Sequence, residues 1–283
     1  MTEAYNKIEI RAVDFGVGGS TVDGALIHPY AMGSSLKDFV NDFQGSYGDW
    51  TDAPGFDWKS EKSLFAFWFG VNDIAINHFK AEHGEEYVRA PLQEIFESYM
   101  MSLNTVRHSS RPLVIHQTHL TSFQLYDAGA RNFLILTCPP FDRSIIDISD
   151  PWYAQRHLNT IADISAFNSR IYDMLYSFRA NHTDAHASVF DAHRLFASVL
   201  DHPVDFPAMD GVHNTTGVCR EADAEDQPGP LDVVYEQNIC RNGELIRSYA
   251  WTGLHATYPV HNATAAQIVL DCFDGEGTGE FCT

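Results

Sequence analysis

The 283-residue sequence predicts an α/β protein in which helices cover both faces of a mostly parallel sheet, a three-layer α/β/α sandwich. Three observations support this prediction. Continuous apolar runs of strand length recur along the chain, segments with helical periodicity lie between them, and 45% of the residues are hydrophobic. Because no linker or change of composition divides the chain, we expect residues 1–283 to form a single domain.

The expected strands are short and apolar. Residues 8–17 form a β-rich stretch that runs into Gly16, and residues 64–69 form a continuous apolar run that ends at Gly70. Residues 133–136, which precede a Pro-Pro pair, and residues 187–190 are the third and fourth expected strands. Continuous hydrophobicity is typical of strands that are covered on both faces, as in parallel sheets.

The expected helices lie between and after these strands. Residues 91–103 and 161–178 carry apolar side chains at helical spacing, and residues 264–270 form a last helix. Strands that alternate with helices predict a parallel sheet.

The charge of the chain limits its partners. Lys and Arg number 18 against 38 Asp and Glu, a formal net charge of −20. An acidic surface repels phosphate groups, so we expect neither nucleic acid nor an anionic membrane as a partner. The sequence has no apolar run of about 20 residues and its N-terminus does not resemble a secretory signal peptide.

Cysteines and glycosylation patterns nevertheless favour a secreted protein. Cys219 with Cys240 and Cys272 with Cys282 form two local pairs that we interpret as disulfides, with free thiols as the alternative. Each bond would stabilise the fold by about 3 kcal/mol. The fifth cysteine, Cys138, lies in an apolar run and is expected to be buried. Asn-X-Thr patterns occur at Asn181, Asn214 and Asn262.

Polar residues follow the expected strands, where ligands gather in open α/β sheets. Residues 17–23 contain Gly-Gly-Ser, residues 70–73 read Gly-Val-Asn-Asp, and His255 precedes the last expected helix. Taken alone, each is more simply an ordinary turn, an Asx turn or a structural histidine. Their occurrence together in this order favours a catalytic site.

These blocks resemble those of the GDSL-type, or SGNH, hydrolases, and more narrowly the fungal secreted acetyl esterases of carbohydrate esterase family 16. The resemblance is carried by residues 18–23, 70–73, 254–257 and, around a diproline turn, 128–143, and it extends from about residue 5 to the final helix. It implies the flavodoxin-like SGNH fold and cleavage of short acyl esters, expected here on acetylated carbohydrates.

The resemblance also implies roles for three residues. Gly19 would supply a backbone N–H and Asn72 a side-chain amide to an oxyanion hole, and His255 would be the catalytic base. Donors placed at the developing oxyanion stabilise the transition state, and losing one costs roughly 3 kcal/mol. His255 would accept a proton from a serine and return it to the leaving alcohol.

The family's nucleophile is missing from this sequence. The serine of a Gly-Asp-Ser block normally ends the first strand, and no Gly-Asp-Ser occurs here. We therefore interpret the first strand, the nucleophile and a signal peptide as absent together, as a start codon placed too far downstream would produce. Because losing the nucleophile of a triad lowers the rate by about 10⁶, we expect the chain as written to be nearly inactive.

Two further departures concern Thr252 and residues 106–124. Thr252 stands where the family has the Asp of Asp-x-x-His, so we expect a Ser–His dyad or a backbone carbonyl that orients the histidine. We interpret residues 106–124 as an insertion, with a retained intron as the hypothesis. This segment contains His116 and His119, which lack a carboxylate partner, so neither a metal nor another cofactor is expected.

Three interpretations remain open. The preferred one is a secreted, monomeric serine ester hydrolase whose sequence is incomplete. The second is a non-catalytic descendant that keeps the fold and binds carbohydrate. In the third, Ser20 replaces the missing nucleophile, although it belongs to the turn that forms the oxyanion hole.

Overall fold

The computed structural model describes residues 16–28, 35–37, 60–82, 90–103, 125–127, 129–144, 151–219, 239–252 and 255–272. The chain divides into two compact units. The sheet unit consists of Val13–Leu136 and Ala166–Val189, and the C-terminal unit consists of Met1–Ala12, Thr137–Ser165 and Phe190–Thr283. That the two units belong to a single domain stays a prediction.

A parallel sheet forms the centre of the sheet unit. Its strands are β1 (Leu64–Phe67), β2 (Asn132–Leu136) and β3 (His186–Phe190), in the order β1-β2-β3. β1 and β2 run parallel, with Phe65 opposite Phe133. The structure confirms the α/β class and these three strands.

The strands differ in how far they are buried. Every residue of β2 is buried, as its apolar run predicts. In β1 only Phe67 is buried and Ala66 is exposed, so coverage of this strand on both faces was a wrong expectation. A methyl group offers little apolar area to bury, so an apolar run does not by itself require a covering layer at that position.

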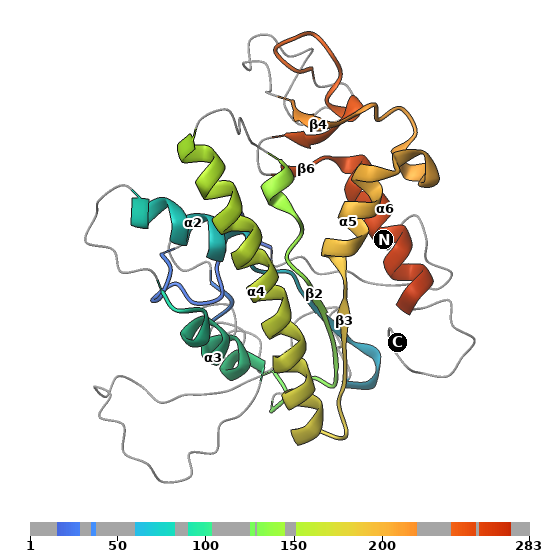
Figure 1. Cartoon of the computed structure of the whole chain (residues 1–283). Helices are drawn as coiled ribbons and strands as arrows, with labels where there is room; N and C mark the ends of the chain where they lie inside the picture. The colour runs from blue at the N-terminus through green and yellow to red at the C-terminus, as the bar shows by residue number, and fades with distance from the viewer. Residues whose placement is uncertain are drawn as a thin grey trace. The chain divides into compact units, whose positions relative to one another are not determined.

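Helices pack on this sheet and on one another. The helices that enter the sheet unit are α2 (Val71–Glu82), α3 (Leu92–Leu103) and α4 (Pro151–Asn181). The C-terminal half of α4 lies along β2 and β3 (Figure 1), where the rings of Phe133 and Phe178 meet with centroids 5.2 Å apart. Phe96 of α3 contacts Phe167 of α4 at 4.7 Å. These aromatic contacts hold the core of the unit.

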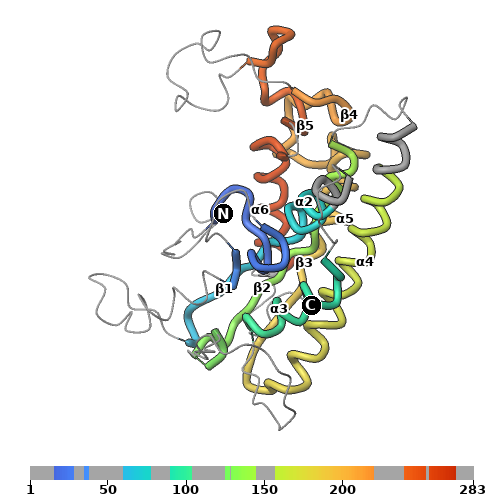
Figure 2. The backbone as a smooth tube through the Cα atoms, turned by 90° about the vertical axis from the view of Figure 1, so that its left-hand side faces the viewer, coloured from blue at the N-terminus to red at the C-terminus, as the bar shows by residue number. Residues whose placement is uncertain are grey.

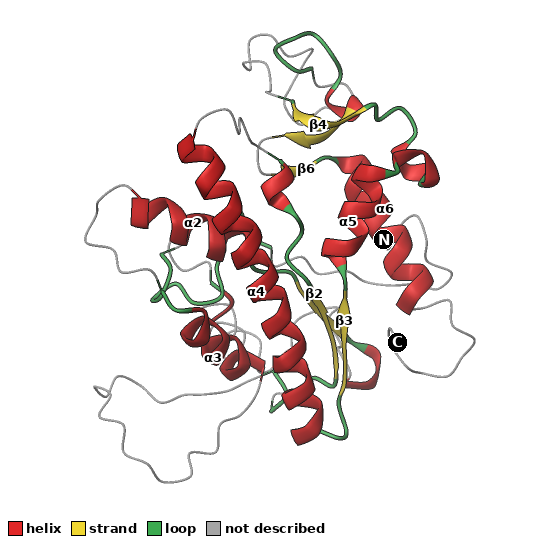
Figure 3. Ribbon diagram, in the orientation of Figure 1, coloured by secondary structure: helices red, strands yellow, loops and turns green. Residues whose placement is uncertain are grey.

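The C-terminal unit contains a second, smaller sheet. Its strands are β4 (Asn214–Val218), β5 (Tyr249–Thr252) and β6 (His255–Ala256). The same unit contains the helices α5 (Ala192–Asp201) and α6 (Tyr258–Cys272) (Figure 3). β4 and β5 run parallel, whereas β5 and β6 form an antiparallel hairpin. Short 3₁₀ segments complete the described elements: Ser60–Lys62, Phe141–Arg143, Pro203–Asp205, Pro207–Met209 and Ile246–Ser248.

The sequence predicted some of these elements and missed others. The helix expected at 91–103 is α3, while α4 and α6 begin earlier than expected because their first turns carry few apolar residues at helical spacing. The strand expected at 8–17 falls outside the described residues, except for Gly16 and Val17, which are not in a strand. The insertion proposed at 106–124 also lies outside them.

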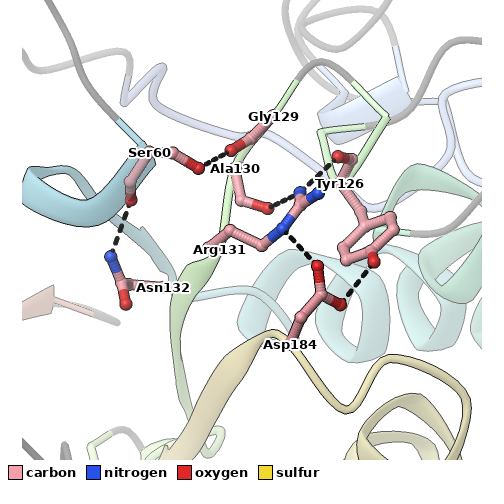
Figure 4. Close-up of polar contacts among 7 residues, drawn as sticks. All are labelled: Ser60, Tyr126, Gly129, Ala130, Arg131, Asn132 and Asp184. Carbon is pink, nitrogen blue, oxygen red and sulfur yellow. Dashed lines mark hydrogen bonds and ion pairs between the residues drawn. The ribbon is translucent and has the colours of Figure 1, made fainter.

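A polar clasp ties the start of β2 to the loop between α4 and β3 (Figure 4). Arg131 Nε donates to Asp184 Oδ2 over 2.9 Å, and its guanidinium lies 4.0 Å from the centroid of the Tyr126 ring. The Tyr126 hydroxyl donates to the other oxygen of Asp184. Nearby, Ser60 donates to the carbonyl of Gly129. The clasp positions β2 at the end opposite to the predicted site.

Two further features concern burial and hydropathy. Cys138 carries a fully buried thiol, as expected for a small apolar side chain. None of the helices in the described ranges is both long and apolar enough to cross a membrane.

Candidate active site

The first part of the site is a tight turn that includes Gly19. The carbonyl of Val17 accepts hydrogen bonds from the backbone N–H of Ser20 at 3.2 Å and from its hydroxyl at 2.6 Å. Gly19 has a φ of +82°, a left-handed conformation that favours glycine because it has no Cβ. The Gly-Gly-Ser sequence therefore supplies the geometry that the turn requires.

The second part is the N-terminus of α2, which lies beside this turn (Figure 2). Asn72 is in the first helical turn, directly after β1 and Gly70. Its Nδ2 donates to the backbone carbonyl of Ser20 over 3.1 Å. An amide nitrogen carries two N–H donors, so this bond uses one of them. The structure thus brings Asn72 next to the Ser20–Thr21 peptide, one residue after Gly19.

Asp73, the next residue of α2, makes a second link to the same segment. Its Oδ1 accepts a hydrogen bond from the backbone N–H of Val22 at 2.9 Å, and the side chain is only 1% exposed. Its Oδ2 has no hydrogen-bond partner within the described part of the chain, and neither does the buried hydroxyl of Tyr99.

Burial shifts the pKa values of the Asp73 carboxyl and the Tyr99 hydroxyl. Desolvation raises the pKa of Asp73 to about 6, although the backbone N–H groups of Val22, Gly70 and Asp73 itself favour the carboxylate. Desolvation also raises the pKa of the Tyr99 hydroxyl, and the charge of Asp73 adds to this shift.

A second buried carboxylate, Asp23, is fully partnered. Its Oδ2 accepts from Lys37 Nζ at 2.8 Å and from the Ser98 hydroxyl at 2.7 Å, while its Oδ1 accepts from the backbone N–H of Ala25 at 2.9 Å. Burial acts to raise the pKa of Asp23, but these hydrogen bonds and the charge of Lys37 outweigh it and lower the pKa. Asp23 therefore anchors the segment after Gly19 to α3 as a carboxylate.

The predicted base, His255, belongs to the hairpin of the C-terminal unit. His255 and Thr252 lie directly opposite each other across the antiparallel strands, and His255 is exposed. The hairpin is held by Thr257, which is fully buried, donates its N–H to Ala250 O at 2.9 Å, and bonds the carbonyl of Tyr249 through its hydroxyl at 2.6 Å. Thr252, where the resemblance implies an Asp, is thus next to His255.

His261, on the first turns of α6, also contacts this hairpin. Surrounding protein desolvates its imidazole and lowers its pKa, even though part of the side chain is exposed. A hydrogen bond to the backbone of Ala256 opposes this shift, and the nearby His255 adds to it. His261 therefore supports the strand that carries the predicted base.

The structure forms two pairs from the predicted site residues. In the sheet unit Asn72 bonds Ser20, the residue after Gly19, and in the C-terminal unit Thr252 lies opposite His255. That the two pairs form one active site stays a prediction. Ser20, the substitute nucleophile of the third interpretation, bonds through its hydroxyl to Val17.

Sequence reasoning named Asp73 without giving it a role beyond an Asx turn. Its bond to Val22 joins residues 51 positions apart, which no local pattern reveals. Asp142 lay in the diproline block but was given no role. Burial raises its pKa, and the nearby His157 and His193 act to lower it.

The structure describes one of the two predicted disulfides. Cys219 and Cys240 form a disulfide with a Cα separation of 5.3 Å. Both are buried, and the backbone N–H of Cys219 donates to Trp251 O at 2.9 Å, which ties the bond to β5. The side chain of Cys272 and the whole of Cys282 lie outside the described residues.

The three glycosylation patterns lie in different settings. Asn181 is exposed at the end of α4, with its amide bonded to the Ser177 carbonyl at 2.8 Å. Asn214 begins β4 and accepts from the Gly217 N–H at 2.6 Å, and Asn262 lies within α6.

The described ranges contain no group of three or more His, Cys, Asp or Glu side chains arranged to hold a metal ion. His116 and His119 fall outside those ranges.

Comparison with known proteins identifies the family of the chain. The family model of the GDSL-like lipases and acylhydrolases matches residues 3–266, so the chain belongs to that family. An acetylesterase of Thermothelomyces thermophilus is 26% identical to it over 220 residues, which cover 77% of this chain. The matched region spans 64% of that relative's length.

Proposed function

We propose that this chain is part of a serine ester hydrolase that removes short acyl groups, acetyl above all, from carbohydrates. The observation that carries the proposal is the 3.1 Å hydrogen bond from Asn72 Nδ2 to Ser20 O, which places the Asn72 amide beside the Gly19 turn. Family membership supports ester hydrolysis, and the similarity to an acetylesterase supports a short acyl group.

The proposed oxyanion hole uses two donors. The Gly19 N–H and the second N–H of the Asn72 amide would bind the oxygen that becomes negative as the tetrahedral intermediate forms. Both belong to well-fixed segments, because Ser20 and Asn72 are joined directly and Asp73 bonds Val22. Fixed donors need no reorganisation during the reaction, which is the basis of oxyanion stabilisation.

His255 would act as the general base and then as the general acid. It would take the proton of the attacking serine hydroxyl and deliver it to the sugar hydroxyl that leaves. Because Thr252 stands opposite His255 and carries no charge, the imidazolium would lack the usual carboxylate support. We therefore propose a dyad in place of a triad.

The nucleophile is expected outside the given sequence, which contains no Gly-Asp-Ser. We propose that the complete protein is secreted, in accord with the Cys219–Cys240 disulfide, which persists in oxidising compartments. We also propose that it acts as a monomer on a small acylated substrate, without nucleic acid or membrane partners.

The test begins with the genomic sequence upstream of this chain. We expect it to encode, in frame or across an intron, a strand that ends in Gly-Asp-Ser. This chain joined to that segment, called here the extended protein, should hydrolyse 4-nitrophenyl acetate and acetylated sugars, and changing the added serine to Ala should abolish the activity. Full activity after that change would contradict the proposed mechanism.

A second candidate is a non-catalytic protein that keeps the fold and binds carbohydrate. The absence of Gly-Asp-Ser from the sequence favours it. The upstream sequence separates the two candidates, because a missing nucleophile block there would leave only binding. If this chain alone hydrolyses 4-nitrophenyl acetate and Ser20→Ala removes that activity, Ser20 is the nucleophile instead.

A further inference from the structure

Asp73 occupies an unusual position beneath the proposed oxyanion hole. It is 1% exposed, yet one of its carboxylate oxygens, Oδ2, has no hydrogen-bond partner in the described part of the chain. Leaving a buried carboxylate oxygen unpaired costs free energy, and a neutral asparagine in this place could still accept the Val22 N–H without a buried charge. A purely structural residue at this place would not need to be an acid.

The bonds around Asp73 point to the role of its charge. Asp73 Oδ1 accepts from Val22 N at 2.9 Å, and the adjacent Asn72 donates to Ser20 O at 3.1 Å. Two consecutive residues of α2 therefore hold the chain at both sides of Thr21. A charged acceptor forms a stronger hydrogen bond than a neutral one, so the Val22 bond depends on the ionisation of Asp73.

We propose that Asp73 is a positioning residue for the oxyanion hole: its carboxylate fixes the Val22 N–H and thereby sets the Gly19 N–H against the Asn72 amide. This inference rests on the proposed function, because it names the group that aligns the two donors. Asp73 itself touches no substrate in this scheme. It acts through the segment that follows Gly19.

The surroundings of Asp73 decide how its charge behaves. Two titratable groups interact with Asp73. They are Asp23, in the segment that follows Gly19, and the Tyr99 hydroxyl on α3. Asp23 is itself paired with Lys37 at 2.8 Å. Since the pKa of Asp73 is raised to about 6 by burial, the donors should be aligned above pH 6 and less firmly held below it.

The test is an NMR titration of the full chain between pH 4.5 and pH 8, which needs no catalytic activity. We expect the Asp73 carboxyl carbon, the Val22 and Gly19 amides and the Asn72 side-chain amide to shift together, with one midpoint near 6. In Asp73→Asn, which keeps the size and an acceptor oxygen, the shared transition should vanish. In Asp184→Asn, an exposed carboxylate of the polar clasp, it should remain.

Two results would overturn the inference. In the first, the chemical shifts of the Gly19 and Asn72 amides in the wild-type chain do not change with the midpoint of Asp73. This result can be seen even if Asp73→Asn fails to fold. The other is a shared transition that persists in a folded Asp73→Asn chain.

Kinetics of the extended protein complete the test. Asp73→Asn should lower kcat by about tenfold with KM unchanged, because alignment of the donors matters in the transition state. An equal loss at pH 5 and pH 8, or a loss confined to KM, would count against positioning. Failure of the proposed function would appear as no hydrolysis with the NMR coupling intact, whereas failure of this inference would appear as hydrolysis without the coupling.

Discussion

The side-chain amide of Asn72 and the backbone carbonyl of Ser20 are joined by a hydrogen bond of 3.1 Å. This bond connects the helix that follows β1 with the turn that carries Gly19, 52 positions apart in the chain. It fixes one N–H of the amide and directs the other, so the residue serves both the turn and the proposed oxyanion hole.

Replacing Asn72 tests this double role. In the extended protein, Asn72→Ala should lower kcat for 4-nitrophenyl acetate by about 10²–10³, because one oxyanion donor is lost. Gln93→Ala removes a different amide, which donates to the exposed Glu97, and should leave the rate unchanged. A similar small effect of both changes on kcat would exclude Asn72 from the oxyanion hole.

Asp73 gives the stability of the chain a distinctive dependence on pH. Its pKa is raised from 3.8 to about 6 in the folded state, so the folded chain binds the extra proton between these values. The free energy of unfolding contributed by this group is therefore complete below pH 3.8 and is lost as the pH rises through 6. The loss corresponds to about 3 kcal/mol.

Urea denaturation of wild type and Asp73→Asn at several pH values measures this term. The amide of the variant does not titrate, so its free energy of unfolding relative to wild type should rise by about 3 kcal/mol between pH 3.5 and pH 8. Other carboxylates titrate in both proteins and cancel in the difference. A difference that does not change with pH would contradict the raised pKa.

The sequence predicted the elements of the fold best where apolar runs are long. The run at 133–136 predicted β2 because a strand buried on both faces needs continuous hydrophobicity, and α3 followed from its helical spacing. α2 was missed because its first turn, Asn72 and Asp73, resembles a loop. The small sheet was missed because β4 reads Asn-Thr-Thr-Gly-Val, which lacks an apolar run, and its partner strands are four and two residues long.

The site was predictable in part for a similar reason. Residues that follow parallel strands gather at one edge of a sheet, and the family resemblance assigned Gly19 and Asn72 to the same oxyanion hole. The bonds from Asp73 to Val22 and from Asp23 to Ser98 depend on how loops fold back over 51 and 75 positions. Such contacts leave no periodic or local signal, so only the structure reveals them.

The Asp23–Lys37 pair should stabilise the segment after Gly19. The carboxylate is 5% exposed but the lysine is 46% exposed, so we expect Lys37→Met to lower the free energy of unfolding by only about 1 kcal/mol at pH 7. Because the pKa of Asp23 is lowered, this contribution is present above its unfolded value of 3.8 and is lost as the pH falls below it.

Thermal or urea unfolding at pH 7 and pH 3 distinguishes this ion pair from simple packing of the lysine stem. The destabilisation by Lys37→Met should shrink at the lower pH, and the exposed Lys62→Met should have little effect at either pH. An equal destabilisation at both pH values would assign the effect to packing.

The Cys219–Cys240 disulfide should be a main support of the C-terminal unit. It closes a sequence separation of 21 residues, and removing such a bond costs about 2–4 kcal/mol. We expect the double change Cys219→Ser and Cys240→Ser to lower the midpoint of urea unfolding under non-reducing conditions. With a reducing agent present, wild type should fall to about the stability of the variant. No difference between the two proteins without reductant would show that the bond does not form.

Thr252 offers a gain-of-function test of the proposed dyad. It lies directly opposite His255 in the β5–β6 hairpin, at the place where the family has an acid. A carboxylate there would stabilise the positive imidazolium that forms as the serine attacks. Thr252→Asp should therefore raise kcat/KM of the extended protein by about tenfold or more, while Thr252→Ser, which adds no charge, should leave it near the wild-type value.

The gain in activity from Thr252→Asp should depend on pH. The benefit requires an ionised aspartate, so it should disappear as the pH falls towards about 4, the usual pKa of an Asp carboxyl. If Thr252→Asp and Thr252→Ser have equal activity at pH 7 while both fold normally, the Thr252 position does not support the base. In that case His255 must be oriented by a backbone group, the other arrangement that the sequence predicts.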